Sequence, residues 1–397
     1  MPPIIFRKGL DMKAAVAGQL AEAYHSRIVD DLRSVGYVRT QGRLTIHLAR
    51  EFGFCYGVER AVDYAYQTRK KFPDSRVFLT GEIIHNPHVN NQLRAQGIRF
   101  LTDPGEDRTT LGRDDVVILP AFGVSVDDMV RLDRQGCTLV DTTCGSVLTV
   151  WKNVKRYAQD GFTSIIHGKL HHEETRATAS QASLFPDGHY LVVLHKGEAA
   201  EVCHYIVHGG DRGAFLERFG SAASPGFDPD RHLRRLGCAN QTTMLMTESL
   251  EIGDMFRAAM EARHGTSAMG DVFRSFDTIC SATQERQDAV IALLDEAPLD
   301  LMVVIGGYNS SNTCNLAKIC AERYPTFHIA EADCLVSATE VRQRRIGAPS
   351  TAAVAETVAR DWLPAHGPLV IGLTAGASTP NNVVGQVVAR LEALAGS

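Results

Sequence analysis

The stretch Cys137-Thr-Leu-Val-Asp-Thr-Thr-Cys144 decides the fold of this chain, because its pattern recurs around two other cysteines. A short apolar or extended segment runs into Cys144, and apolar residues follow at i, i+3, i+4 and i+7, the spacing of an amphipathic helix. Cys55 lies between the segment beginning at Leu44 and a second helical pattern, and Cys280 follows the segment beginning at Phe273 and precedes a third. Three strand–cysteine–helix units predict three similar α/β subdomains.

Polar residues recur about 30 residues after each cysteine, where an apolar segment that we predict to be a strand ends. These polar ends are His85-Asn86, His172-Glu173-Glu174 and Asn309-Ser310-Ser311-Asn312. A later strand of each unit stops on further small or polar residues: Ser125, Gln241-Thr242-Thr243 and Ser378-Thr379. Because ligands bind outside the carboxyl ends of parallel strands, we expect one central cavity. Three small, mostly parallel sheets around a pseudo-threefold axis would direct the cysteines and the polar residues into it.

Each of these features has an ordinary explanation when it is taken alone. Ser, Thr, Asn and Gly after a strand are typical of loops and helix caps. A buried free cysteine often behaves as a small hydrophobic residue. The threefold coincidence of cysteine and polar strand end at similar spacing favours a functional site.

The bulk composition is typical of a cytoplasmic enzyme. A chain of 397 residues fits two or three domains, and 41 basic against 46 acidic residues argue against a nucleic-acid partner. Nine cysteines without a dense framework predict reduced thiols. We expect no membrane association, because no apolar run approaches the roughly 18 residues that a membrane helix needs and no signal-peptide core is recognisable.

The repeats divide the chain into an N-terminal helical arm and three α/β subdomains. The expected boundaries are 1–43 for the arm and 44–143, 144–279 and 280–397 for the subdomains. In the arm, Leu20, Tyr24, Ile28 and Leu32 recur at i+4, which predicts packing on the body or on a second subunit in a homodimer. Two segments, at about 202–235 and 335–368, interrupt the repeats and are predicted to be peripheral.

Three converging thiols leave the kind of metal site open. A structural zinc site normally takes four protein ligands, and this chain has no CxxC pair. Thiolates also bind iron–sulfur clusters, which usually have four cysteine ligands. With three, one iron would lack a protein thiolate and could bind substrate. The long intervals between the cysteines match no short cluster motif.

A resemblance to a known family rests on short stretches that occur in order between Leu44 and Leu391. The stretches are Phe52-Gly-Phe-Cys55-Tyr-Gly, Glu82-Ile-Ile-His85-Asn, Asp141-Thr-Thr-Cys144, His172-Glu-Glu174-Thr, Asn240-Gln-Thr242-Thr, Cys280-Ser-Ala-Thr-Gln-Glu-Arg, Asn309-Ser-Ser-Asn312 and Thr374-Ala-Gly-Ala-Ser378. Together they resemble the 4-hydroxy-3-methylbut-2-enyl diphosphate reductases, which catalyse the last step of the non-mevalonate isoprenoid pathway. The arm and two further stretches, Leu119-Pro-Ala-Phe-Gly123 and His167-Gly-Lys-Leu-His-His172, resemble the plant and cyanobacterial branch.

The resemblance implies a cofactor and a role for each matching residue. A [4Fe–4S] cluster with one open iron site would be held by Cys55, Cys144 and Cys280. The diphosphate of the substrate would be bound by His85, His172, Ser310, Asn312 and Ser378, with Ser311 close by. Glu174 would supply protons to the leaving hydroxyl with the help of Thr242 and His172, and Gln241 would lie beside them. Reduced ferredoxin or flavodoxin would supply the electrons.

The chain departs from the family pattern at two places. Phe122 stands where many bacterial members have a diphosphate-binding histidine, a feature that the plant-like branch shares. Gly145-Ser146 follows Cys144 where the family usually has proline and a larger residue, which we expect to alter the exposure or lability of the cluster. The remaining six cysteines are expected to be ordinary thiols: Cys137, Cys203, Cys238, Cys314, Cys320 and Cys334.

Two other functions fit part of the pattern. Quinolinate synthase also combines three α/β domains with a three-cysteine [4Fe–4S] cluster, but its dehydration chemistry needs no external electrons. A redox-sensing iron–sulfur protein is the second alternative, although a sensor has no need for an acid, hydroxyls and amides around its cluster. The ordered polar stretches favour the reductase over both.

Overall fold

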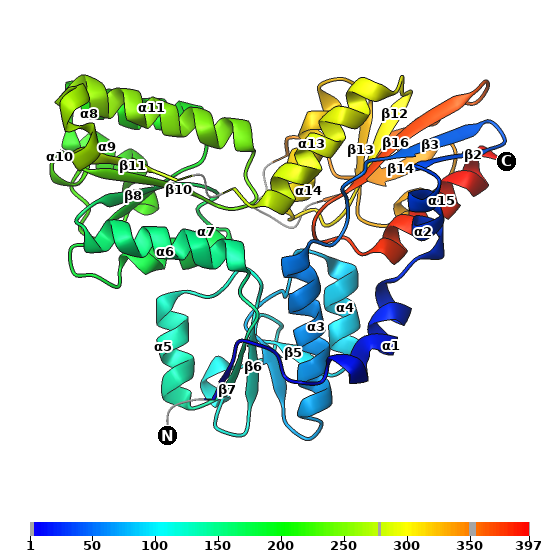
Figure 1. Cartoon of the computed structure of the whole chain (residues 1–397), viewed down its shortest axis with the longest axis horizontal. Coiled ribbons are helices and arrows are strands. Elements are labelled where there is room, and N and C mark those ends of the chain that lie inside the picture. Colours follow the sequence, from blue (N-terminus) through cyan, green and yellow to red (C-terminus); the bar gives the residue numbers. More distant parts are fainter. Residues whose placement is uncertain (1–3, 277–278, 349–354, 397) are drawn as a thin grey trace. The chain divides into compact units, whose positions relative to one another are not determined.

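The structure is a computed structural model that describes residues 4–276, 279–348 and 355–396 (Figure 1). Residues 1–3, 277–278 and 349–354, which belong to three of the predicted segments, lie outside the described residues. The chain forms two compact units. Unit 1 contains Asp107–Asp115 and Leu119–Cys280 with the first residues of the chain, and unit 2 contains Phe6–Glu106, Val116–Ile118 and Ser281–Ser397.

Unit 1 contains a four-stranded parallel sheet with the order β11-β10-β8-β9. Its strands are β8 (Thr163–His167), β9 (Tyr190–Val193), β10 (Leu236–Asn240) and β11 (Phe273–Ser275). The unit's longer helices are α5 (Val126–Gln135), α6 (Gly145–Gln159), α7 (Glu173–Ala182), α8 (Lys196–His208) and α11 (Met246–His264). Strands β8 and β10 are buried along their whole length, as expected where helices cover both faces of a parallel sheet.

The segment 202–235 was predicted to be peripheral, and this prediction is wrong for its apolar residues. It holds the end of α8 and short helices: α9 (Arg212–Phe219), η2 (Gly220–Ala222) and α10 (Pro229–His232). Phe215, Phe219 and Phe227 are buried in one core with Leu191 of β9. The segment therefore completes the core of unit 1. Three short elements follow α11: η3 (Thr266–Ala268), α12 (Met269–Val272) and β11.

Unit 2 contains a five-stranded sheet with the order β13-β12-β16-β3-β2, in which only the β2–β3 pair is antiparallel. The strands are β2 (Val38–Gln41), β3 (Leu44–Leu48), β12 (Leu301–Ile305), β13 (Thr326–Ile329) and β16 (Leu369–Ala375). The helices of this part are α13 (Ser281–Glu296), α14 (Ser311–Ala321) and α15 (Asn381–Ala395). A hairpin of β14 (Glu340–Gln343) and β15 (Thr357–Arg360) follows η4 (Ala332–Cys334).

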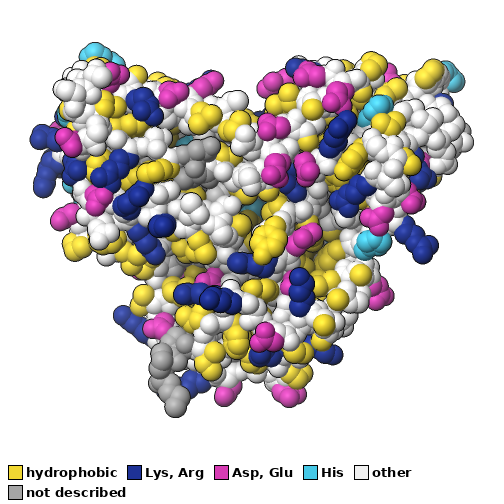
Figure 2. Space-filling model, in the orientation of Figure 1, with side chains coloured by type: hydrophobic (Ala, Val, Ile, Leu, Met, Phe, Trp, Pro, Cys, Tyr) yellow, Lys and Arg dark blue, Asp and Glu magenta, His cyan; other side chains and the backbone are white. Residues whose placement is uncertain are grey.

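A third sheet has the order β1-β7-β6-β4-β5. Its strands are β1 (Ile5–Phe6), β4 (Val77–Leu79), β5 (Ile98–Phe100), β6 (Val116–Leu119) and β7 (Thr138–Asp141). The accompanying helices are α3 (Tyr56–Lys71), α4 (Pro87–Ala95) and η1 (Arg108–Thr110). Among the described residues, no helix combines the length and the apolar character needed to cross a membrane. Basic and acidic side chains are interspersed on the face drawn in Figure 2.

The predicted α/β class with several small, mostly parallel sheets is confirmed. Two details differ from the expectation. Strand β4 ends at Leu79, where its partner β5 also ends, and a loop rather than a strand leads to His85. Strand β3, assigned by the sequence pattern to the first subdomain, pairs with β16 near the end of the chain. The subdomain boundaries and the pseudo-threefold axis stay predictions.

The N-terminal arm forms two helices, α1 (Lys13–Tyr24) and α2 (Arg27–Ser34), which pack on unit 2. The two helices are separate because His25 has an extended backbone and Ser26 caps α2. The hydroxyl oxygen of Ser26 accepts from the N–H of Val29. Tyr24 is buried, and its hydroxyl accepts a hydrogen bond from Tyr66 of α3. Helix α2 lies against α15 at Gly385, where a Cβ would come within 2.1 Å of the Ser26 hydroxyl oxygen.

We expect Gly385→Val to lower the free energy of unfolding by about 1–3 kcal/mol, because the added side chain displaces the Ser26 cap and overpacks the contact with α2. The measurement is the urea unfolding transition. Gly18→Ala in the middle of α1 is the control, since a Cβ there meets nothing within 4 Å among the described residues. That change should raise stability by about 0.5–1 kcal/mol through helix propensity. Equal midpoints for Gly385→Val and wild type would contradict the packing argument.

Candidate functional site

Each of the three cysteines singled out by the sequence immediately precedes a helix. Cys55 precedes α3, Cys144 precedes α6 and Cys280 precedes α13. All three thiols are half-buried, and each cysteine N–H donates to a backbone carbonyl: that of Ala377 for Cys55, Ala121 for Cys144 and Thr242 for Cys280. The N-terminus of a helix carries a partial positive charge that favours thiolates and other anions.

Of the other six cysteines, four lie in the protein core, whereas Cys203 and Cys314 are half-buried. Cys137, Cys238, Cys320 and Cys334 are buried. Burial raises the pKa of the Cys203, Cys238 and Cys320 thiols to about 12. Such thiols stay protonated at neutral pH and are poor metal ligands. That all six are ordinary thiols stays a prediction.

In unit 1, Glu174, Thr242 and Cys280 form one chain of hydrogen bonds. The side chain of Glu174, in the first turn of α7, is 1% exposed. Its Oε1 accepts from the N–H of Thr242 at 2.6 Å, and the carbonyl of Thr242 accepts from the N–H of Cys280 at 3.3 Å. The backbone of Thr242 thereby bridges the buried carboxyl group of Glu174 and the backbone of Cys280.

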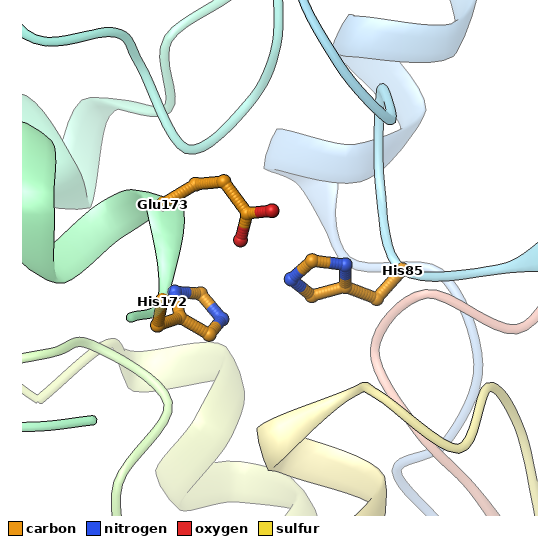
Figure 3. Close-up of side chains that lie close together, drawn as sticks. All are labelled: His85, His172 and Glu173. Carbon is orange, nitrogen blue, oxygen red and sulfur yellow. The ribbon is translucent and has the colours of Figure 1, made fainter. Parts of the chain in front are cut away.

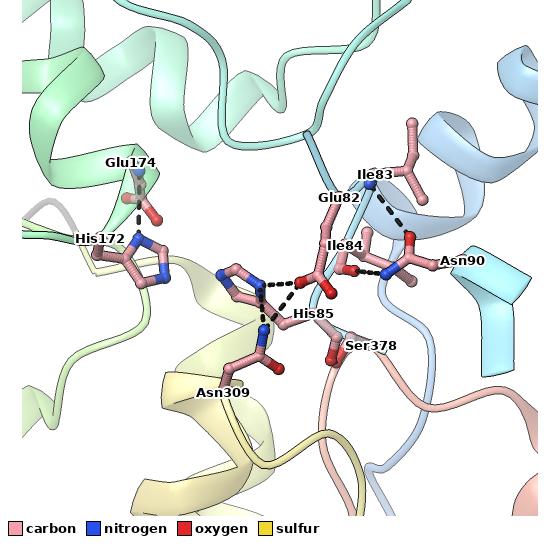
Figure 4. A network of polar contacts seen from close by, with 9 residues as sticks. All are labelled: Glu82, Ile83, Ile84, His85, Asn90, His172, Glu174, Asn309 and Ser378. Carbon is pink, nitrogen blue, oxygen red and sulfur yellow. Dashed lines mark hydrogen bonds and ion pairs between the residues drawn. The ribbon is translucent and has the colours of Figure 1, made fainter. Parts of the chain in front are cut away.

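His172 occupies the position before α7 and is buried (Figures 3 and 4). Its Nδ1 accepts from the N–H of Glu174 at 3.2 Å, so a neutral ring carries its hydrogen on Nε2. Phe122 packs edge-on against the His172 ring, with 5.5 Å between ring centroids. Phe122 therefore limits the orientation of the His172 ring.

Gln241, at the end of β10, is fully buried and fixes the loops around Glu174. Its Oε1 accepts from the N–H of Lys169 at 3.1 Å and from the Thr175 hydroxyl at 3.2 Å. Its amide nitrogen donates to the hydroxyl of Thr243 at 2.7 Å. These contacts indicate that Gln241 orients the neighbouring residues.

Ser146 contacts one of the three cysteines. Its hydroxyl, in the first turn of α6, donates to Sγ of Cys280 at 3.5 Å. Because Cys144 directly precedes this helix, the contact also brings the backbone around Cys144 close to Cys280. The Ser146 hydroxyl is therefore a hydrogen-bond donor to Sγ of Cys280.

In unit 2, the loop after β12 and the loop after β16 bring Ser310, Asn312 and Ser378 together. Ser310 caps α14, its hydroxyl oxygen accepting from the N–H of Thr313 at 3.4 Å. Oδ1 of Asn312 accepts from the N–H of Ala377, whose carbonyl accepts from the N–H of Cys55. One predicted diphosphate ligand, Asn312, and one predicted cluster ligand, Cys55, are thus joined through the backbone of Ala377.

The N-terminus of α14 has the properties of an anion site. Ser310, Ser311 and Asn312 are all buried, and the backbone N–H groups of a helix's first turn lack partners within the helix. The Nδ2 of Asn312 is buried and has no hydrogen-bond partner among the described residues. An unsatisfied buried donor costs about 1–3 kcal/mol, which an oxygen-rich ligand would recover.

His85 lies in the loop between β4 and α4 and is held through both its backbone and its ring (Figure 4). The hydroxyl of Ser378 donates to the His85 carbonyl at 3.2 Å. A Cβ at Gly307 would come within 2.2 Å of the same carbonyl oxygen, so only glycine allows this approach of the β12–α14 loop. On the ring, Nδ1 lies 2.9 Å from Oε2 of Glu82 and 3.1 Å from Nδ2 of Asn309.

Arg286 is a residue of the site that the sequence argument missed. Its guanidinium, on α13 and 3% exposed, donates to the carbonyls of Gly53 and Phe54, immediately before Cys55. Gly53 has φ +72°, a conformation that side chains disfavour. The position of Arg286 in the helix that follows Cys280 was a possible sign that it belongs to the site. The loop that it contacts lies more than 200 residues away in sequence, so local pattern could not identify this partner.

Comparisons with known proteins agree with this architecture. The family model described as "LytB protein" matches residues 46–392. The 4-hydroxy-3-methylbut-2-enyl diphosphate reductases of Gloeobacter violaceus and of a Synechococcus strain are 51% and 50% identical; the alignments cover 98% and 97% of this chain, and 93% and 94% of theirs. A solved structure of (E)-4-hydroxy-3-methyl-but-2-enyl diphosphate reductase is 26% identical with a TM-score of 0.53, covering 88% of this chain and 99% of that one.

We expect Arg286→Gln to loosen the loop before Cys55. The substitution leaves the carbonyls of Gly53 and Phe54 without their donor, which destabilises the closed loop by about 1–3 kcal/mol. Hydrogen exchange in a peptide spanning residues 52–58 should become faster by about tenfold or more. A peptide containing β12 should exchange as in wild type. Arg99→Gln, which breaks the Arg99–Glu106 pair, is the control and should leave both peptides unchanged. Unaltered exchange at 52–58 in Arg286→Gln would contradict the role of Arg286.

Proposed function

This chain belongs to the 4-hydroxy-3-methylbut-2-enyl diphosphate reductase family, and on that premise we propose the reaction that it catalyses. The reaction is the reductive dehydroxylation of (E)-4-hydroxy-3-methylbut-2-enyl diphosphate to isopentenyl diphosphate and dimethylallyl diphosphate, the last step of the non-mevalonate isoprenoid pathway. One observation carries the proposal. Buried Asn312, at the start of α14, has a donor without a partner in the described part of the chain and is linked through Ala377 to Cys55, which precedes α3.

A [4Fe–4S] cluster fits the three proposed ligands, Cys55, Cys144 and Cys280. The thiols are half-exposed and lie at helix N-termini, and Ser146 offers a hydroxyl to one sulfur. When bound, such a cluster supplies a Lewis-acidic iron without a protein thiolate and the electrons for the reduction.

Neutral groups of unit 2 would bind the diphosphate. Hydroxyls and amide of Ser310, Asn312 and Ser378 surround the start of α14, together with backbone N–H groups. His85 is joined to this set through Ser378, and Ser311 lies in the first helical turn. Helix N-termini bind phosphate without a cationic clamp, and a neutral pocket leaves no unpaired charge when it is empty.

Glu174 would hold the proton that the leaving hydroxyl needs. The Oε1 of Glu174 already accepts from the N–H of Thr242, so the proton of the acid form would reside on Oε2. Thr242 orients the carboxyl group through this hydrogen bond. His172 accepts from the backbone N–H of Glu174, and Gln241 accepts from the hydroxyl of Thr175, the next residue of α7. Protonation turns a poor leaving group into water, the usual contribution of a general acid.

The remaining assignments belong to the same proposal. Reduced ferredoxin or flavodoxin would deliver electrons one at a time in the cytoplasm. A homodimer stays a prediction.

We expect anaerobically purified protein to oxidise reduced viologen dye when (E)-4-hydroxy-3-methylbut-2-enyl diphosphate is added. Cys144→Ser should abolish this turnover, since it removes a cluster ligand. Glu174→Gln keeps the acceptor for Thr242 but removes the acid, so kcat should fall by about 10²-fold or more. The matched controls are Cys203→Ser and Glu217→Gln in unit 1, both expected to retain wild-type rates.

Three outcomes would contradict the proposal. Protein with a full iron and sulfide complement that shows no substrate-dependent oxidation would favour the dehydratase or the sensor alternative. Condensation or dehydration without electron uptake would identify the former. Normal turnover by Glu174→Gln would remove Glu174 from its role as acid.

Removal of the Ser146 hydroxyl should lower the reduction potential of the bound cluster, because hydrogen bonds to cluster sulfurs raise it. The variant is Ser146→Ala, and the measurement is an anaerobic redox titration followed by electron paramagnetic resonance. Ser183→Ala, an exposed position at the end of α7, is the control. An identical potential in Ser146→Ala and wild type would show that the contact with Cys280 has no electronic effect.

A further inference from the structure

We propose that Glu82 is a positioning residue for diphosphate recognition, because its carboxylate holds Nδ1 of His85 and Nδ2 of Asn309 at a single oxygen atom. This inference rests on the proposed function, in which His85 contacts the diphosphate. It adds to that function two residues, Glu82 and Asn309, for which the sequence argument assigned no role.

The geometry identifies Glu82 as the common acceptor. Its Oε2 lies 2.9 Å from Nδ1 of His85 and 2.8 Å from Nδ2 of Asn309 (Figure 4). The two nitrogens are themselves 3.1 Å apart, so both side chains converge on one carboxylate oxygen. An amide nitrogen can only donate, and an ionised carboxylate can only accept, so Nδ1 carries the hydrogen that points to Glu82.

The carboxylate is in its charged form. Burial favours the neutral acid of Glu82, but the hydrogen bonds from His85 and Asn309 outweigh it, so the pKa of Glu82 lies below its ordinary value. Arg94, the nearest contributing guanidinium, is itself paired with Asp103 at 2.8 Å. The close partners of Glu82 are therefore two residues of the diphosphate region.

Other groups hold the backbone around His85, whereas Glu82 contacts its ring. Asn90 of α4 accepts from the N–H of Ile83 and donates to the carbonyl of Ile84, and Ser378 donates to the carbonyl of His85. With Nδ1 directed to Glu82, the opposite ring nitrogen, Nε2, faces away from the carboxylate. The hydrogen bond on one imidazole nitrogen sets the role of the other.

Through Asn309, Glu82 also positions the residues at the start of α14. Asn309 directly precedes Ser310, the cap of α14 and a proposed diphosphate ligand. A fixed Asn309 side chain therefore limits the motion of the loop that ends in the anion site. Preorganisation of this kind lowers the entropy cost of binding a ligand, and it should act on affinity more than on chemistry.

The test compares Glu82→Leu, which removes the acceptor, with Glu82→Gln, which keeps one acceptor oxygen without charge. For (E)-4-hydroxy-3-methylbut-2-enyl diphosphate, we expect KM to rise by about tenfold or more in Glu82→Leu and by less in Glu82→Gln. At saturating substrate, kcat should stay within about twofold of wild type. The Kd of inorganic pyrophosphate, measured by calorimetry, should rise in parallel with KM. Glu106→Gln, which breaks an ion pair elsewhere in unit 2, is the matched control.

A double-mutant cycle separates positioning from a general loss of structure. If Glu82 acts through His85, Glu82→Leu should change KM by less than about twofold in a His85→Ala background. Additive effects would overturn the inference, as would an unchanged pyrophosphate Kd in Glu82→Leu. A fall in kcat together with a lower urea midpoint would also overturn it, since that pattern indicates a structural role. Wild-type protein without turnover would overturn the proposed function instead, and pyrophosphate binding would then decide the inference alone.

Discussion

The start of a helix at the carboxyl end of a strand is the constraint on which both parts of the site depend. In a parallel sheet the chain leaves each strand at the same edge and turns into a helix whose first N–H groups lack partners. Cys55, Cys144 and Cys280 occupy such positions, and so do His172 and Ser310. The same backbone donors favour thiolate, carboxylate and phosphate oxygen.

Many site residues therefore serve two purposes at once. His172 and Ser310 cap helices through Nδ1 and Oγ while they remain candidates for substrate contact. Neutral caps satisfy most of the buried donors when no ligand is bound, which avoids the cost of buried unpaired charge. Asn312 and Thr313 of α14 are exceptions, because the buried Nδ2 of Asn312 and the buried Oγ1 of Thr313 lack hydrogen-bond partners among the described residues. The Nδ2 of Asn312 is a donor that an oxygen-rich ligand would satisfy.

Several side chains hold the loops and rings of the proposed site in place. Arg286 holds the loop before Cys55, and Gln241 holds the loops beside Glu174. Phe122 packs against His172, and Glu82 directs His85. Each of these contacts limits one torsion or one loop, so together they reduce the freedom of the proposed ligands before substrate arrives.

Local pattern was enough to predict the three cysteine–helix junctions and the α/β class, because strand and helix periods and cap chemistry act between near neighbours in sequence. The strands that were predicted to run up to His85, His172 and Asn309 end earlier, and loops lead to these residues. Tertiary structure alone decided that β3 pairs with β16 and that the segment 202–235 fills a core. It alone also brought Arg286 to Gly53, Asn309 to Glu82 and Ser146 to Cys280. These contacts join residues more than 100 positions apart, and no local periodicity encodes which distant partner a buried polar group will meet.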